Sequence, residues 1–258
     1  RAAMGHIRDT ANDNQWTLSP DCCLPICWAS AGSVLTLSAS DLITFAEAHL
    51  DHGNTKNGTT WLSDTAIELM QKPSVNLPPY SPWSSTHCGL GWHLMRGDHP
   101  AIVGHCGVGP GQRALLQLVP EQGLAIAALH NSNNAELLPT LFSELLSELT
   151  DIQLPEIKTK PDYAKDLDLD SLVGRYESIL SAFVVSIGKG KLHLKYMVDK
   201  YSPEKTECWI LRSIDHNTFS ICTEFGEPGL TLSFLDINQY GKPATLYCMG
   251  RLIPRVAD

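Results

Sequence analysis

The stretch from residue 101 to 131 constrains the fold more than any other part of the chain. Apolar runs and turns alternate along it: run 101–103, Gly104-His105-Cys106-Gly107, turn 109–111, run 114–119, turn 120–123 and run 124–129. Short apolar runs separated by turn-forming residues are typical of adjacent antiparallel strands. The stretch therefore predicts an antiparallel sheet, with a hairpin between its last two runs.

His105 is the candidate functional residue of this stretch. It is a polar, titratable side chain among glycines at a strand's start, where a backbone can approach a ligand closely. The alternative is that His105 is a structural histidine whose hydrogen bonds are satisfied at the strand end. The pattern alone leaves both interpretations open.

Helical signals lie on both sides of the predicted sheet. Ser38 is a good N-cap, Asp41 follows three residues later and Gly53 is a stop signal, so we expect a helix between them. Two more helices are expected, from Ser63 to the residue before Pro73 and over 134–150. A strand is expected over 89–95, and a long Pro- and Ser-rich loop over 74–88. Helices, four antiparallel strands and a covering helix predict an α+β domain over 1–150.

The chain changes character after residue 150. Prolines, lysines and aspartates predict an interdomain linker over 151–167. β-rich runs then recur at short intervals, over 172–176, 183–187, 191–198, 208–212, 218–223, 230–235 and 244–252. Regularly spaced short strands are typical of antiparallel barrels and sandwiches. We therefore expect an all-β domain over 168–258.

Charge and hydropathy exclude several classes of function. A net charge of −9 argues against a nucleic-acid partner, which needs a basic surface. No apolar run approaches the roughly 20 residues of a transmembrane segment. The chain starts at Arg1 without a signal-peptide pattern, so we expect either a removed signal or a piece of a longer protein. Localisation stays open between the periplasm, secretion and the cytoplasm.

The cysteines give no sign of a metal site. Of the eight, Cys22, Cys23 and Cys27 crowd together and the others are scattered. A zinc site would need paired cysteines with a second pair at a set distance. We expect buried or reactive thiols, no metal and no cofactor, with the disulfide state open.

Two other catalytic patterns are weak. A triad of His105 with Ser30 or Ser33 is conceivable, but the chain has no Gly-x-Ser-x-Gly nucleophile elbow around them. Paired carboxylates for glycoside chemistry cannot be picked out.

An ordered set of short motifs resembles the C-terminal half of the serine β-lactamase and DD-peptidase superfamily. The resemblance is to its esterase and D-aminopeptidase-like branch, of the peptidase S12 type, which is typical of bacterial enzymes. The matching pieces occur in the family's order: Ala3-Met4-Gly5-His6, Ser30-Ala31-Gly32-Ser33, Ser40-Asp41-Leu42, Gly89-Leu90-Gly91-Trp92, Gly104-His105-Cys106-Gly107 and Pro110-Gly111. Residues 172–253 look like the lipocalin-like β-domain that often follows that catalytic domain.

The resemblance implies serine acyl-transfer chemistry. In that family a Ser-x-x-Lys supplies nucleophile and base, and a Tyr-x-Asn or Ser-x-Asn supplies a second proton-transfer group. A Lys/His-x-Gly strand, matched here by His105-Cys106-Gly107, lines the opposite wall of the site. His105 would bind or polarise the substrate, Gly104 and Cys106 would line it, and the Val108 amide would face the oxyanion. Cys106 replaces the usual hydroxyl residue, which favours an ester or peptide substrate over a β-lactam.

The other two motifs have no acceptable match. Ser202-Pro203-Glu204-Lys205 fits Ser-x-x-Lys literally, but it lies in a loop-like stretch of the predicted β-domain. No Tyr-x-Asn occurs, and Ser74-Val75-Asn76 stands in the wrong chain order. We therefore expect the C-terminal portion of a serine hydrolase, inactive alone, whose partner is a missing N-terminal half or another subunit. The alternative is a non-catalytic homologue of the β-lactamase fold that acts as a binding or regulatory module.

Overall fold

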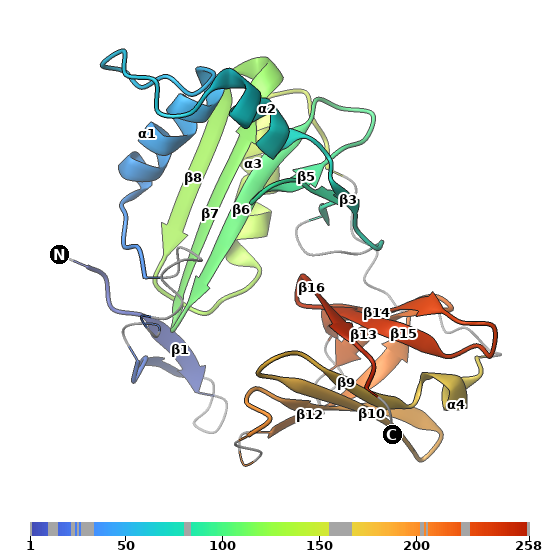
Figure 1. The fold of residues 1–258 in the computed structure, drawn as a ribbon. Coiled ribbons are helices and arrows are strands. Elements are labelled where there is room, and N and C mark those ends of the chain that lie inside the picture. Colours follow the sequence, from blue (N-terminus) through green and yellow to red (C-terminus); the bar gives the residue numbers. More distant parts are fainter. Residues whose placement is uncertain are drawn as a thin grey trace. The chain divides into compact units, whose positions relative to one another are not determined.

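A computed structural model of the chain describes residues 2–9, 15–21, 24, 26, 34–79, 84–154, 167–201, 204, 206–222 and 228–256. The chain forms two compact units (Figure 1). One unit comprises residues 1–77 and 85–155, and the other comprises residues 78–84 and 156–258. The first is mixed α and β and the second is built on a nearly closed antiparallel sheet, so the predicted fold class is confirmed.

An antiparallel sheet organises the first unit. Among the described residues it has six strands in the order β3-β4-β5-β6-β7-β8. Their bounds are β3 Val75–Asn76, β4 His87–Cys88, β5 His93–Met95, β6 Ile102–Gly109, β7 Gln112–Val119 and β8 Leu124–His130. Pro110 and Gly111 alone join β6 to β7, and the φ of 63° at Gly111 explains the glycine in this tight turn. The short helical turn η3, Pro120–Gln122, joins β7 to β8.

Helix α1, Ala39–Leu50, covers one face of this sheet. It begins at Ser38 with a capping box, in which the Ser38 hydroxyl accepts from the Asp41 N–H and the Asp41 carboxylate accepts from the Ser38 N–H at 2.9 Å. The buried Ala46 packs with Val103, Leu116 and other apolar residues of β5, β6 and β7. Helix and sheet thus share one core on this face.

Two more helices complete the first unit. Helix α2, Asp64–Gln71, lies where a helix from Ser63 was predicted, and the Ser63 side chain caps it. Helix α3, Leu137–Leu149, buries Leu138, Phe142 and Leu146, four residues apart, and contacts β7 and β8. Successive strand residues point to opposite faces, so Leu115 is buried on the face away from α1, where Figure 1 shows α3. The sheet therefore lies between two helical layers.

The N-terminal segment is fastened to one end of the sheet. It forms a hairpin of β1, His6–Asp9, with β2, Gln15–Leu18. The His6 N–H points at the carbonyls of Gly111 and Asn131, each 3.0 Å away. A Cβ on Gly5 would lie 2.1 Å from the Pro110 carbonyl oxygen, so only glycine fits against the β6–β7 turn.

The second unit is a nearly closed antiparallel barrel. Its described elements are α4 Leu169–Leu172, β9 Gly174–Glu177, β10 Ala182–Gly188, β11 Lys191–Met197, β12 Thr206–Ser213, β13 Thr218–Cys222, β14 Pro228–Ile237, β15 Pro243–Cys248 and β16 Arg251–Pro254. Each strand pairs with the next along the chain. A bridge between Tyr176 and Arg255, with the Val256 N–H donating to the Arg175 carbonyl at 2.9 Å, joins the first strand to the end of the last. The sheet therefore returns to itself.

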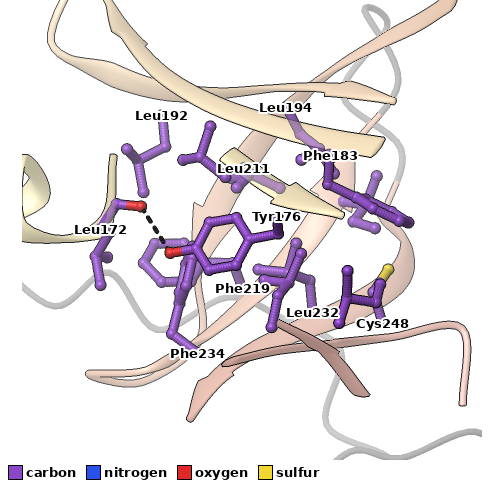
Figure 2. Close-up of a cluster of buried hydrophobic side chains, with 14 residues drawn as sticks. Leu172, Tyr176, Phe183, Leu192, Leu194, Leu211, Phe219, Leu232, Phe234 and Cys248 are labelled. Atoms are coloured by element: carbon purple, nitrogen blue, oxygen red, sulfur yellow. Dashed lines mark hydrogen bonds between the residues drawn. The ribbon is translucent and has the colours of Figure 1, made fainter. Parts of the chain in front are cut away.

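Side chains fill the interior of the barrel (Figure 2). Tyr176, Phe219 and Phe234 are among its largest fully buried residues, and the rings of Tyr176 and Phe234 lie 5.9 Å apart. The Tyr176 hydroxyl donates to the Leu172 carbonyl at 3.3 Å, so its polar atom is satisfied inside an apolar core. In the part of the chain that the structure describes, the barrel interior is a packed core.

Several predicted boundaries are corrected by the structure. The expected loop over 74–88 carries β3 and β4, because β4 pairs with β5 and β3 pairs with β4, which draws both ends of that segment into the sheet. The strand expected from residue 89 begins at His93, since Gly91 has a φ of 79° and forms a turn. A turn at Met249 and Gly250, both with positive φ, divides the run over 244–252 into β15 and β16.

Candidate functional site

The candidate site lies on β6, whose two neighbouring strands pair with it over different lengths. On one side, β7 pairs with the whole strand from Val103 to Gly109. On the other side, β5 pairs only with residues 102–104. Beyond Gly104, no strand within the described ranges continues the ladder on the β5 side. Residues 105–109 therefore present one edge of backbone hydrogen-bonding groups, here called the open edge.

Hairpin geometry decides which backbone groups lie along the open edge. In a two-residue hairpin the pair flanking the turn, here Gly109 and Gln112, exchanges hydrogen bonds, and the bonded pairs alternate from there. Gly109, Gly107 and His105 therefore direct their N–H and C=O groups to β7. Val108 and Cys106 direct theirs to the open edge. The Val108 N–H thus points to the open edge, away from β7.

His105 stands at the start of the open edge with its side chain exposed. It pairs with Leu116 of the α1-facing layer, so its side chain leaves the sheet on that face. Its Nδ1 lies 2.7 Å from the Cys106 carbonyl oxygen. A carbonyl oxygen only accepts, so Nδ1 carries a proton and donates it.

Gly107 and Gly104 serve different purposes beside His105. Gly107 is exposed on the same face, and the missing side chain leaves the surface next to His105 flat. Gly104 is buried on the opposite face, where a Cβ would lie 1.9 Å from Oε1 of Gln117. Gln117 therefore folds over Gly104, and that glycine is set by packing inside the unit.

Cys106 lies on the sheet face opposite His105 and is half-buried. Burial raises the pKa of its thiol, and the Arg113 guanidinium opposes that rise only in part. The thiol is therefore protonated at neutral pH, and it is no thiolate nucleophile. Its backbone, which borders the open edge, is better placed than its sulfur to meet a ligand there.

The sequence prediction missed His93, which lies beside the open edge, and its neighbour Cys88 on β4. The rings of His93 and His105 have centroids 5.4 Å apart, and Nδ1 of His93 lies 3.8 Å from the Cys88 sulfur. His93 pairs with Gly104, the last β6 residue with a partner on that side. The sequence signal for His93 was a polar residue at the start of β5. That signal was not enough, because the sequence alone did not place β5 beside β6.

Some predicted pieces lie outside the described residues. They are Ser30-Ala31-Gly32-Ser33, Cys22, Cys23, Cys27 and most of Ser202-Pro203-Glu204-Lys205. A second literal Ser-x-x-Lys, Ser186 to Lys189, is described: Ser186 is on β10 and Lys189 has a φ of 50° in the following turn. A strand and turn do not set serine and lysine one helical turn apart, so this pattern is no nucleophile motif. Ser74-Val75-Asn76 forms the exposed end of the sheet at β3.

Two searches of the described residues bear on other functions. Within them, no three His, Cys, Asp or Glu side chains are grouped as metal ligands. None of the helices in the same ranges is both long and apolar enough to cross a bilayer.

Comparison with known proteins links this architecture to one family. The family model described as Beta-lactamase matches residues 3–142, more than half of the chain. Penicillin-binding protein 4 from Amycolatopsis lactamdurans is 33% identical over 182 residues, which is 69% of this chain and 46% of that protein. The chain thus spans about half the length of this relative.

Two solved structures share the fold. The crystal structure of SurE aligns with 98% of this chain and 55% of its own, with a TM-score of 0.72 and 23% identity. The crystal structure of SurE with D-Leu aligns with 85% of this chain and 50% of its own, with a TM-score of 0.61 and 24% identity.

Proposed function

Because the chain belongs to the beta-lactamase family, we propose that it is the C-terminal portion of a serine hydrolase that forms an acyl-enzyme with a small ester, amide or peptide. In this proposal residues 1–150 are the C-terminal part of the catalytic domain, 151–167 a linker and 168–258 a lipocalin-like domain. The observation that carries the proposal is the open edge of β6, where the Val108 amide and the exposed His105 lie on a rigid strand.

The open edge would act on the oxygen of the scissile carbonyl. When a serine hydroxyl attacks the carbonyl carbon, the C=O double bond becomes a C–O single bond and negative charge collects on that oxygen. The Val108 N–H would donate to it, and such preorganised donors stabilise the charge without reorganising. His105 would hold or polarise the acyl group beside it. Serine and base would come from a missing N-terminal half or another subunit.

The substrate class follows from the residues next to His105. Cys106 stands where a hydroxyl is usual in this motif, and its sulfur is on the face away from His105. A thiol binds a carboxylate weakly compared with a hydroxyl. Short esters and D-amino-acid amides are therefore better substrates in this proposal than cephalosporins.

A second candidate function is a non-catalytic binding or regulatory module. It is favoured by the sequence, which has no Tyr-x-Asn, and by the described helices, none of which carries a Ser-x-x-Lys. This module would use the open edge to bind a strand or peptide without turnover. The described barrel core is tightly packed, so the open edge is the better binding surface of the two units.

The test uses the longest open reading frame that contains this chain and the chain by itself. Each is treated with a fluorophosphonate probe and assayed with a chromogenic short-chain ester, a D-amino-acid anilide and a chromogenic cephalosporin. Labelling of one serine, with turnover of the ester or anilide, supports the hydrolase. Neither labelling nor turnover in either protein, with both folded by circular dichroism, sinks it in favour of the binding module.

A further inference from the structure

His93 and His105 lie next to each other at the point where β5 stops pairing with β6. His93 begins β5 and pairs with Gly104, and His105 is the next residue of β6, the first of the open edge. Their ring centroids are 5.4 Å apart and the rings are tilted by 50°. Neither ring takes part in an ion pair with any residue in the described ranges. The two imidazoles therefore form a pair whose protons are governed by their immediate neighbours.

The tautomer of His105 is fixed by a backbone carbonyl. Its Nδ1 lies 2.7 Å from the oxygen of Cys106, which can only accept, so the proton is on Nδ1. In the neutral ring the other nitrogen, Nε2, is then a bare acceptor. The exposed ring of His105 thus offers a lone pair to a ligand at the open edge.

The tautomer of His93 is set by a thiol. Its Nδ1 lies 3.8 Å from Sγ of Cys88 on β4. Burial raises the pKa of the Cys88 thiol, so the sulfur keeps its proton. An imidazole nitrogen accepts better than sulfur does, which makes the thiol the donor. His93 therefore carries its own proton on Nε2, the opposite arrangement to His105.

Positive charge is disfavoured on the His93 ring. Burial lowers the pKa of His93, and the neighbouring His105 lowers it further. Among the described residues, Cys88 of β4 and His105 of β6 contact His93, and the protonated Cys88 thiol adds no negative charge to offset this. The neutral form of the His93 ring is therefore favoured at neutral pH.

We propose that His93 is a positioning residue for His105, which keeps the pair as one fixed Nε2–H donor beside one Nε2 acceptor. In the proposed hydrolase, Nε2 of His105 would accept a hydrogen bond from an N–H or O–H of the substrate and so hold the acyl group at the open edge. This catalytic use rests on the proposed function, but the arrangement of protons does not.

Nuclear magnetic resonance of the imidazole nitrogens tests the arrangement on the chain itself. Long-range ¹⁵N–¹H spectra report which nitrogen carries the proton and follow each ring through a pH titration. We expect His93 as the Nε2–H form, and an upward shift of its titration midpoint in His105→Gln, because a neighbouring positive charge is lost. His216→Gln, an exposed histidine of the barrel, is the matched control and leaves His93 unchanged.

The outcome is decisive in each direction. A His93 midpoint that stays in place in His105→Gln, or a His93 ring protonated on Nδ1, overturns the inference. Cys88→Ala removes the thiol donor, so it should raise the share of the Nδ1–H form of His93; an unchanged tautomer also overturns it. Amide spectra check that each variant is folded. We expect both variants to fold, because His105 is exposed and Cys88 lies on a two-residue strand.

A kinetic arm separates this inference from the proposed function. If the full-length protein turns over an ester, His93→Phe should shift the acid limb of its kcat/KM profile more than it lowers the plateau. A purely structural role would lower the plateau and leave the limb in place, which overturns positioning. Absence of any turnover or serine labelling would sink the proposed function alone and leave the resonance result standing.

Discussion

The guanidinium of Arg255 lies over the ring of Tyr176, 5.7 Å from its centroid, where the end of the last barrel strand meets the first. It also donates to the carbonyl oxygens of Val173 and Ser171 and to the Tyr176 hydroxyl. A Cβ on Gly174 would lie 2.7 Å from Nη2 of Arg255, so glycine makes room for the arginine. One side chain thus joins both ends of the barrel sheet.

Replacing this arginine should destabilise the barrel. Arg255→Met keeps most of the side-chain volume but leaves partly buried carbonyls without a charged donor, which costs about 2–3 kcal/mol. Urea denaturation followed by circular dichroism measures the change. Arg251→Met, at an exposed position of β16, is the control and should change stability by less than about 0.5 kcal/mol. Equal losses in the two variants would contradict a closing role for Arg255.

Gly104 should tolerate no side chain. In Gly104→Ala the new Cβ would meet Oε1 of Gln117 at 1.9 Å and the Leu116 carbonyl oxygen at 2.5 Å. We expect a loss of about 1–3 kcal/mol, typical of overpacking, and only partial rescue by Gln117→Ala because the backbone contact remains. In Gly109→Ala the nearest atom would be 3.9 Å away, so this control should be nearly neutral. Melting temperatures that fall equally would refute the steric account.

His49 makes the first unit sensitive to acid. It is 2% exposed among the rings of Phe45, Trp61 and Trp92, and burial lowers its pKa below the ordinary 6.5. The unfolded chain then binds a proton more readily than the folded chain, so stability present above pH 6.5 falls as pH drops through the lowered pKa. Urea titrations at pH 8 and below pH 6 should show this loss.

The variant His49→Phe isolates that effect. Neither ring nitrogen of His49 has a hydrogen-bond partner among the described residues, so an apolar ring of similar shape should fit and add about 1 kcal/mol above pH 7. The variant should lose less stability in acid than the parent. His93 and His130, whose pKa values are also lowered by burial, remain in both proteins and cancel in the comparison. An identical acid loss in parent and variant would exclude His49 as the cause.

His105→Ala tests the site without disturbing the fold. The side chain is exposed at a strand edge, so we expect a stability change within about 0.5 kcal/mol. In an active full-length protein the acylation rate should fall by roughly 100-fold, as for loss of a group that holds the substrate in its reactive position. Burst kinetics with a chromogenic ester measure it. A large drop in melting temperature with unchanged acylation would instead make His105 structural.

Val108→Pro tests the amide on the open edge. Proline removes the N–H, which by hairpin alternation faces away from β7, and proline is tolerated on edge strands. We expect acylation to fall by roughly 100- to 1,000-fold, as when one oxyanion donor is lost. Val108→Ala retains the amide and should acylate like the parent, because the Val108 side chain is 63% exposed. Equal rates in the two variants would remove Val108 from the oxyanion site.

The sequence predicted the features that local chemistry decides. Ser38 and Asp41 predicted the start of α1, and Pro110-Gly111 predicted the turn between β6 and β7. Caps and tight turns can be predicted in this way because they depend on a few adjacent residues. The strands β3 and β4 were missed because each is two residues long and exists only by pairing within the sheet.

The candidate site was predicted only in part for the same reason. His105 and Val108 share one strand, so the motif placed both. His93 joins them through the register of β5 against β6, a non-local relationship that no periodicity reports. Cys106 was expected to contact substrate, and strand alternation places its sulfur on the face opposite His105.

The unequal pairing of β6 also has a consequence for handling the protein. The same bare N–H and C=O groups that could hold a substrate can template a strand from a second molecule, which is how exposed sheet edges nucleate aggregation. Gly107 and Gly109 interrupt this edge with residues that pair poorly as strands. The two glycines leave the backbone of the open edge accessible to a small ligand. They also make that edge a poor template for aggregation, so the same residues determine ligand access and resistance to aggregation.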